Sequence, residues 1–266
     1  MPEGPEVKIA STYFNSFFKK GEKINFDIIS EYYSKKYSNV FKHIKNNLQT
    51  YRESYTIGKN IFIDLDDKSI FNFHLGMTGG WSKENVKHCH FRAYNSSSEL
   101  FFKDVRKFGN MKILTKNQLN NKHIAEFDLL NKKYNFKKHF NFLNKNNKSK
   151  RSICSILMDQ SFFPGVGNYI KSEALYASNI HPEEKWFKLL DSEKIKLIKK
   201  TKKIMLDSYK HGGAELKDFY NPFHNSTFNL NIYGRKISSN KTKVISQKTS
   251  DQRKTWFCTK NQKLRK

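Results

Sequence analysis

The pattern of apolar residues changes near residue 125 of this 266-residue chain. Before that point, short segments alternate apolar and polar residues, and clusters of Gly, Asn, Ser and Asp separate them, which is typical of the strands of a β-sandwich. Beyond it, apolar residues recur at helical spacing. Strands first and helices later favour an α+β fold of two domains with a groove between them. The predicted strands lie in INFDIIS, YTIGKNIFIDLD, SIFNFHLGM, CHFRAYN and ELFFKDVRKFG.

Helical spacing marks one segment ahead of the strands and several after them. These segments cover residues 6–19, 134–145, 149–160, 167–178 and 183–210. The stretch KTKVISQKTSDQRKTWFCTK near the C-terminus has the pattern of two strands around a polar turn. We therefore predict an N-terminal β-sandwich domain with a flanking helix over residues 1–125, a helical domain over 126–228, and a β-hairpin with a basic tail over 229–266.

The chain is strongly basic, with 50 Lys and Arg against 24 Asp and Glu and a formal net charge of +26. A field of this sign attracts polyanions, so nucleic acid is the first partner to consider and an acidic membrane surface the second. The alternative is a solvated composition of the kind that an AT-rich genome encodes, because Lys, Asn, Ile, Phe and Tyr are all plentiful. An aromatic content of 15% excludes a disordered basic tail.

Targeting and redox features predict an intracellular, non-secreted protein. No stretch has the length and apolarity of a transmembrane span, and the acidic, proline-bearing N-terminus is unlike a secretory signal. The cysteines Cys89, Cys154 and Cys258 are odd in number and far apart. This spacing favours reduced thiols and argues against a structural zinc site, which needs four grouped ligands.

The chain opens MPEGPE, which places a proline second and carboxylates third and sixth. Initiator methionine is generally removed ahead of a small residue, which leaves Pro2 with a free secondary amine. Because an α-amino group titrates near pH 7.7–8.0, roughly a tenth of it is unprotonated at pH 7. Attack of this amine on an aldehyde-type carbon gives a cationic iminium, and the adjacent Glu3 carboxyl can protonate a ring oxygen. The alternative is an ordinary leader in which Glu6 favours the positive end of a helix.

Several separated segments, in the same order along the chain, resemble the formamidopyrimidine-DNA glycosylase and endonuclease VIII family. Together they extend over nearly the whole chain and include the family's catalytic start, its helix–two-turn–helix signature and the two ends of its finger. The matching segments are PEGPE (2–6), HLGMTG (74–79), DVRKFG (104–109), FPGVGNYIKSEALYASNIHP (163–182), YGRK (233–236) and DQRKTWFC (251–258).

This resemblance implies a bifunctional enzyme of base excision repair, which cuts the glycosidic bond of an oxidised base and then breaks the strand by β- and δ-elimination. By position, Pro2 would attack C1′ of the damaged nucleotide and Glu3 would protonate the opening sugar. Glu6 would support the site by hydrogen bonding near the helix start. The resemblance also implies a monomer that binds damaged duplex DNA and needs no metal or organic cofactor.

Two further residues match family positions that contact DNA phosphates. Lys59 follows a glycine between two strand-like runs, where its charge would lower the pKa of the amine and pair with the backbone. Asn168 follows the glycines of PGVGNY, so its side chain and the backbone N–H groups could hold a phosphate at a helix N-terminus. The alternatives are a hairpin-turn lysine and a helix-capping asparagine.

A glycosylase that flips a base out of the duplex leaves a hole, and wedge side chains fill such holes. The family supplies them from the two segments matched here by Met77, Arg106 and Phe108. Arg106 would hydrogen-bond the orphaned base while the other two stack beside it. The alternative for Met77 and Phe108 is a place in the core, because both lie among apolar strand residues.

The sequence departs from the family at the finger, where most members carry two C-x2-C pairs. YGRK is followed by ISSNKTKV without a cysteine pair, and Asn261 stands in the partner position of Cys258. One thiol cannot hold a tetrahedral zinc, so the pattern resembles the zincless finger of some members. Arg253 matches the finger arginine that reaches DNA phosphates, although a lone turn arginine is usually just solvated.

Three local features of the sequence bear on which damaged base the protein prefers. Gly4, the short segment NPFHNSTFNLN at 221–231 and the missing cysteine pairs resemble the endonuclease VIII branch, which favours oxidised pyrimidines such as thymine glycol. Oxidised or ring-opened purines, hydantoins and single-stranded DNA stay open. Two rival classes also stay open: a non-catalytic DNA-binding module of the same fold, and a basic RNA-associated structural protein that charge alone suggests.

Overall fold

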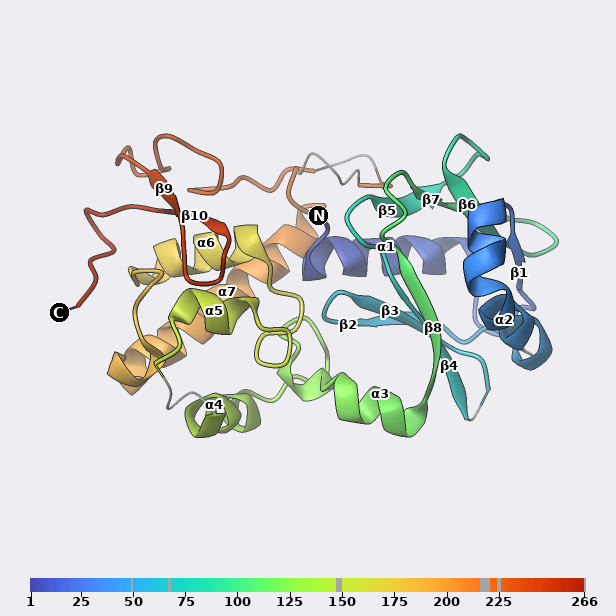
Figure 1. The fold of residues 1–266 in the computed structure, drawn as a ribbon, viewed down its shortest axis with the longest axis horizontal. Helices are drawn as coiled ribbons and strands as arrows, with labels where there is room; N and C mark the ends of the chain where they lie inside the picture. The colour runs from blue at the N-terminus through green and yellow to red at the C-terminus, as the bar shows by residue number, and fades with distance from the viewer. Residues whose placement is uncertain (49, 67, 147–149, 216–220, 224–225, 266) are drawn as a thin grey trace. The chain divides into compact units, whose positions relative to one another are not determined.

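The computed structural model describes residues 1–265 except 49, 67, 147–149, 216–220 and 224–225 (Figure 1). Two compact units make up the chain. Unit 1 consists of Met1–His123 and His211–Thr227, and unit 2 consists of Ile124–Lys210 and Phe228–Lys266. The segment His211–Thr227, which the sequence pattern assigned to the helical domain, therefore packs with the N-terminal residues.

Unit 1 contains the predicted β-sandwich, built from two antiparallel four-stranded sheets. The first sheet has the order β1 (Asn25–Ile28), β6 (Cys89–Tyr94), β7 (Glu99–Asp104), β5 (Gly79–Ser82). The second has the order β2 (Ser54–Ile57), β3 (Asn60–Asp64), β4 (Ser69–His74), β8 (Asn110–Thr115). The predicted fold class, strands first and helices later, is confirmed.

The helices of unit 1 are α1 (Gly4–Phe17), α2 (Glu31–Asn47) and α3 (Lys116–Lys122). Helix α1 is the predicted first helix, but α2 was not predicted. The sequence does contain the helical spacing of α2. One buried face of the helix consists of Tyr33, Tyr37, Phe41 and Ile44. Ser30 also caps the helix by accepting a hydrogen bond from the backbone N–H of Tyr33.

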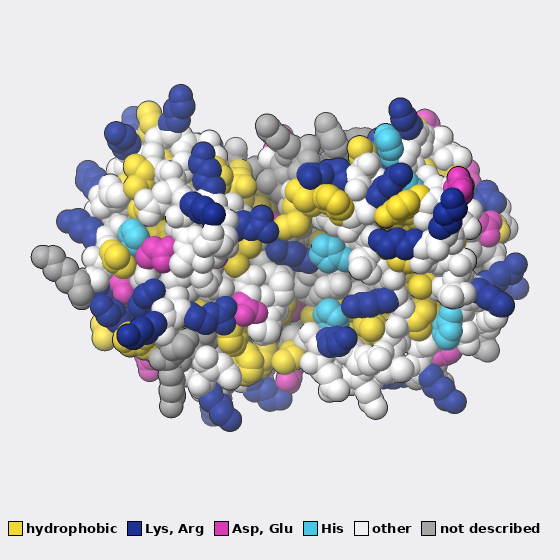
Figure 2. Space-filling model, in the orientation of Figure 1, with side chains coloured by type: hydrophobic (Ala, Val, Ile, Leu, Met, Phe, Trp, Pro, Cys, Tyr) yellow, Lys and Arg dark blue, Asp and Glu magenta, His cyan; other side chains and the backbone are white. Residues whose placement is uncertain are grey.

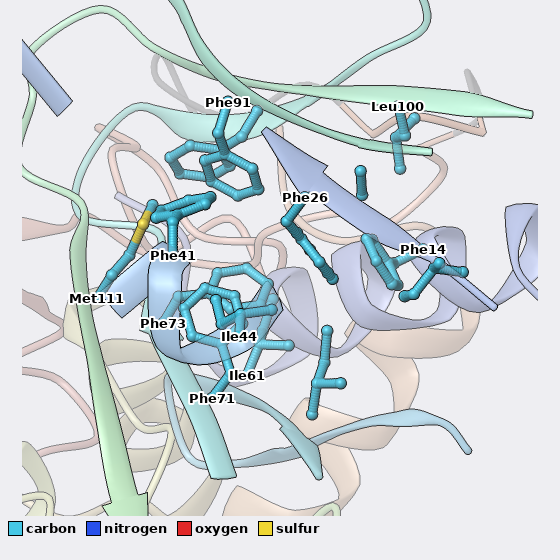
Figure 3. Packing of buried hydrophobic residues seen from close by; sticks show 14 of the residues in the cluster. Phe14, Phe26, Phe41, Ile44, Ile61, Phe71, Phe73, Phe91, Leu100 and Met111 are labelled. Atoms are coloured by element: carbon cyan, nitrogen blue, oxygen red, sulfur yellow. The ribbon is translucent and has the colours of Figure 1, made fainter. Parts of the chain in front are cut away.

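The core of unit 1 is largely aromatic and lies between the two sheets (Figure 3). Phe26 of the first sheet meets Phe71 of the second edge to face, with ring centroids 5.9 Å apart. Phe41 of α2 contacts both Phe71 and Phe91, so the helix closes the sandwich from the side. Such aromatic contacts add to the stabilisation that burial itself supplies.

Unit 2 is helical and ends in a hairpin. Its helices are η1 (Ala125–Phe127), α4 (Phe136–Asn146), α5 (Ile153–Met158), α6 (Asn168–Ser178), η2 (Trp186–Lys188) and α7 (Asp191–Lys210), and its strands are β9 (Ile245–Lys248) and β10 (Lys254–Phe257). Helix α6 is buried almost all round and ends at Asn179, whose φ of 59° is left-handed. None of the helices in the described part of the chain is long and apolar enough to cross a membrane.

A buried histidine makes the stability of unit 2 depend on pH. His139 donates from Nε2 to the carbonyl of Phe162 at 2.6 Å, and its ring packs against Phe127 and Phe163. Burial lowers the pKa of His139 from 6.5 to about 4. Between these values the unfolded chain binds a proton that the folded chain does not, so the free energy of unfolding falls as pH falls. The total loss is about 3 kcal/mol.

We expect denaturant titrations of the parent protein to show this loss between pH 6.5 and 4. His139→Gln keeps a hydrogen-bond donor but cannot titrate, so its stability should fall less steeply over the same window, although it starts lower at pH 7. Parallel pH profiles for parent and variant would contradict the assignment.

Candidate active site and DNA-contacting segments

The start of α1 buries two carboxylates beside Pro2. Glu3, the residue before the helix, is 4% exposed, and Glu6 is fully buried. Oε2 of Glu6 accepts from the backbone N–H of Glu3 at 2.8 Å, and Oε1 accepts from the backbone N–H of Ala214 at 2.9 Å. Glu6 therefore fixes the backbone of the residue that follows Pro2, and its charge lies at the positive end of the helix.

The second partner of Glu6 lies in a segment that sequence reasoning missed. Gly213 has φ of +85°, and a Cβ added there would lie 3.1 Å from Oε1 of Glu6. Ser226 donates from Oγ to the carbonyl of Gly213 at 2.6 Å, which ties the loop back on itself. The doublet Gly212–Gly213 was the available signal, because paired glycines after a long helix indicate a close backbone approach.

Lys59 lies in the turn between β2 and β3, after Gly58 with φ of +60°, and is 7% exposed. The next residue, Asn60, pairs with His74 of β4. Burial lowers the pKa of His74, and the positive charges of Lys59 and Lys112 lower it further. Nδ1 of His74 accepts from the N–H of Gly76 at 2.9 Å, as a neutral imidazole does. His74 lies in the HLGMTG segment, of which only Met77 was predicted to be a site residue.

The two predicted wedge segments are joined backbone to backbone in unit 1. Gly76 has φ of +69°, and a Cβ there would lie 2.5 Å from the carbonyl carbon of Phe108. Asp104, fully buried, accepts from Oγ1 of Thr78 at 2.6 Å and from the N–H of Gly109 at 2.7 Å. One carboxylate thus holds both segments in a fixed relation.

The side chains on these segments differ in exposure. Phe108 is 53% exposed, so the alternative that it belongs to the core does not hold. Arg106 is also exposed and places its guanidinium carbon 4.9 Å from the centroid of the Phe108 ring. Met77 is half-buried. Exposed aromatic and guanidinium groups on a braced loop have the form that a wedge requires.

Substituting Gly76 by alanine should strain this junction. The left-handed backbone and the 2.5 Å approach to a backbone atom leave no room for a methyl group. We expect a loss of at least about 2 kcal/mol in the free energy of unfolding, measured by denaturant titration. Gly80→Ala is the matched control, because a Cβ there meets nothing within 4 Å, and it should change stability by less than about 0.5 kcal/mol. Equal effects of the two substitutions would contradict the close approach.

Asn168 and Arg253 both belong to unit 2. Asn168 begins α6 and donates from Nδ2 to the carbonyl of Lys254 at 2.9 Å, which ties the helix start to β10. As the first residue of α6, Asn168 also places its amide at the positive end of the helix dipole, which favours an anion. Arg253 is exposed in the turn of the β9–β10 hairpin. Glu173 is structural, because its carboxylate accepts from the N–H groups of residues 231–233.

The residues near Cys258 do not fit a metal. The Cys258 thiol donates to Oγ1 of Thr242 at 3.2 Å, and its buried neighbours Tyr176, Ile232 and Val244 are apolar. Across the described ranges, no group of three or more His, Cys, Asp or Glu residues could hold a metal ion. Lys and Arg side chains are spread over the face shown in Figure 2, with few Asp and Glu among them.

Comparisons with known proteins identify the family. The model of the formamidopyrimidine-DNA glycosylase N-terminal domain matches residues 1–111, and that of its H2TH domain matches residues 129–219. A formamidopyrimidine-DNA glycosylase of Wolbachia sp. subsp. Brugia malayi is 31% identical over 284 residues, covering 97% of this chain and 98% of that protein. One from Mycoplasma mobile is 30% identical over 282 residues, covering 99% and 100%.

Solved structures show the same fold. Lactococcus lactis Fpg in complex with abasic-site DNA superposes with a TM-score of 0.81 at 23% identity, covering 98% of this chain and 99% of that chain. MutM in complex with DNA containing carbocyclic 8-oxo-G gives a TM-score of 0.78 at 23% identity, covering 98% and 100%. Fold, matched domains and full-length relatives agree: the chain belongs to the formamidopyrimidine-DNA glycosylase family of DNA glycosylase/AP lyase enzymes.

Proposed function

We propose that the chain removes oxidised bases from DNA through an iminium formed at Pro2. After loss of Met1, the Pro2 nitrogen attacks C1′ of the damaged nucleotide. The bond from C1′ to the base breaks, and Glu3 protonates the ring oxygen as the sugar opens. The iminium then withdraws electrons, so the 3′ and 5′ phosphates leave in turn by β- and δ-elimination.

One observation carries this proposal: Glu6, buried and bound to two backbone N–H groups, holds the residue next to the nucleophile in place. A general acid must lie within hydrogen-bond reach of the atom that it protonates. A fixed backbone at Glu3 helps to keep its carboxyl group in one position. Lys59 supplies the positive charge that keeps a neighbouring amine unprotonated and pairs with a DNA phosphate.

The remaining predicted residues are proposed to contact DNA. Asn168 with the N-terminus of α6, and Arg253 in the hairpin turn, bind backbone phosphates. Met77, Arg106 and Phe108 fill the space that the flipped nucleotide leaves. Residues 229–266 act as a finger without zinc, and the protein works as a monomer on damaged duplex DNA.

For the base itself, we propose oxidised pyrimidines. Gly4 and the short segment 221–231 support this preference, although His224 and Asn225 of that segment lie outside the described residues. Lactococcus lactis Fpg, which shares the fold, has been solved with DNA containing an oxidised pyrimidine. The relatives bear the name of a ring-opened purine glycosylase, so the purine alternative is tested in the same experiment.

Borohydride trapping tests the mechanism and the substrate together. One duplex carries a single thymine glycol, a matched duplex carries an oxidised guanine, and a third carries an abasic site. We expect a covalent cross-link that peptide mass mapping places at Pro2, with the thymine glycol duplex trapped fastest. No cross-link on any duplex, from protein confirmed to lack Met1, would instead favour the non-catalytic binding module.

A further inference from the structure

A buried ion pair joins helix α6 to the turn of the β9–β10 hairpin. Nζ of Lys171, whose side chain is fully buried, lies 2.5 Å from Oδ2 of Asp251, whose side chain is 3% exposed. Nζ also donates to Oγ1 of Thr255 at 2.8 Å. Neither charged residue belongs to the site described above, and the two lie 80 positions apart in the sequence.

The second oxygen of Asp251 organises the turn that carries Arg253. Oδ1 accepts from Oγ1 of Thr249 at 2.5 Å and from the backbone N–H of Arg253 at 3.2 Å. Thr249 in turn donates from its own N–H to the carbonyl of Arg253 at 3.0 Å. A single carboxylate therefore connects the Lys171 ammonium to the backbone of Arg253.

The hairpin needs such an anchor. Its strands have four residues each, and an isolated two-stranded hairpin is marginally stable in water. The described residues provide no metal ligand set that could brace it. Other contacts reach the same turn: Ser250 hydrogen-bonds Ser152, and its N–H donates to Glu183 at 2.7 Å.

A buried ion pair is weak evidence for stability, because desolvation of both charges offsets their attraction. Its distinctive effect is to fix geometry, since each charge is satisfied only when the partner is in place. Here the geometry being fixed is the position of a turn arginine relative to the N-terminus of α6, which also carries Asn168.

We propose that the Lys171–Asp251 pair is a positioning device that holds Arg253 for a DNA phosphate, so that an internal ion pair rather than a metal braces the finger. This inference rests on the proposed phosphate contact of Arg253. Lys171 is fully buried and does not itself touch DNA, so any effect of its removal on DNA binding passes through the turn.

A double-mutant cycle tests the pair. Lys171→Met, Arg253→Ala and the double variant are compared by fluorescence anisotropy on a duplex with a stable abasic analogue, over a series of salt concentrations. Circular dichroism fixes a temperature at which every variant is folded. Lys35→Met is the control, because it removes a lysine from the exposed ion pair with Glu31.

Arg253→Ala should weaken binding about tenfold and lower the salt slope by about one. Lys171→Met should do the same, and the double variant should be no worse than either single variant. The control should stay within about twofold of the parent. Where Lys171→Met does not fold, Asp251→Asn replaces it in the cycle with the same expectation.

An unchanged salt slope in Lys171→Met, or additive losses in the double variant, would overturn the positioning role while leaving the phosphate contact standing. No effect of Arg253→Ala would remove the phosphate contact, and the inference with it. The borohydride cross-link at Pro2 tests the catalytic proposal independently of these DNA-binding measurements.

Discussion

Replacing Pro2 by glutamine is expected to abolish the borohydride cross-link and to lower strand cleavage at a thymine glycol by at least about 10³-fold. Glutamine is too large to favour removal of Met1, so the terminal amine is displaced by one residue from the buried start of α1. Single-turnover cleavage and trapping on the same duplex measure the loss.

Pro2→Gly is the matched control for this change. A small second residue still permits removal of Met1, and a primary amine can still form an imine at an abasic site. We expect slower but detectable trapping. Full cleavage by Pro2→Gln with Met1 retained would show that another group is the nucleophile.

Glu3→Gln is expected to separate the two activities. The amide keeps the shape of the side chain but cannot donate a proton to the ring oxygen, so release of an intact damaged base should fall by about 10²- to 10⁴-fold. Cleavage at a ready-made abasic site should fall much less, because no base has to be released there. Single-turnover rates on the two duplexes give the ratio.

The control for Glu3→Gln is Glu31→Gln, which neutralises an exposed carboxylate on α2 and should leave both rates unchanged. Full glycosylase activity in Glu3→Gln would contradict the acid role. An equal loss on both duplexes would point instead to a general disturbance of the α1 start.

The sequence predicted the fold class because each unit shows its own periodicity over many residues. Helix α2 was missed because its sequence is rich in Lys, Asn and Tyr and its buried face is mainly aromatic rather than aliphatic. Its capping serine and the four buried positions were visible, but the surrounding strand-like runs masked their spacing. The periodicity of apolar residues therefore predicted the β-sandwich but did not predict α2, the helix that packs against it.

The site residues likewise include some that are adjacent in the sequence and some whose partners lie far away. Pro2, Glu3 and Glu6 are neighbours in the sequence, so a joint catalytic role could be predicted from them directly. The partner of Glu6 lies 208 positions away, and that of Lys171 lies 80 positions away. No periodicity connects residues at such distances, so only the folded chain shows that Ala214 and Asp251 complete these arrangements.

The bond from Ala214 to Glu6 has a consequence for synthesis of the protein. A ribosome synthesises Glu3 and Glu6 first, and it reaches Ala214 only after the described helices of unit 2, from η1 to α7, have been made. A nascent chain therefore carries its N-terminus for most of translation without the hydrogen bond from Ala214 to Glu6. The start of α1 therefore reaches its folded hydrogen bonding only after at least 214 of the 266 residues have been synthesised.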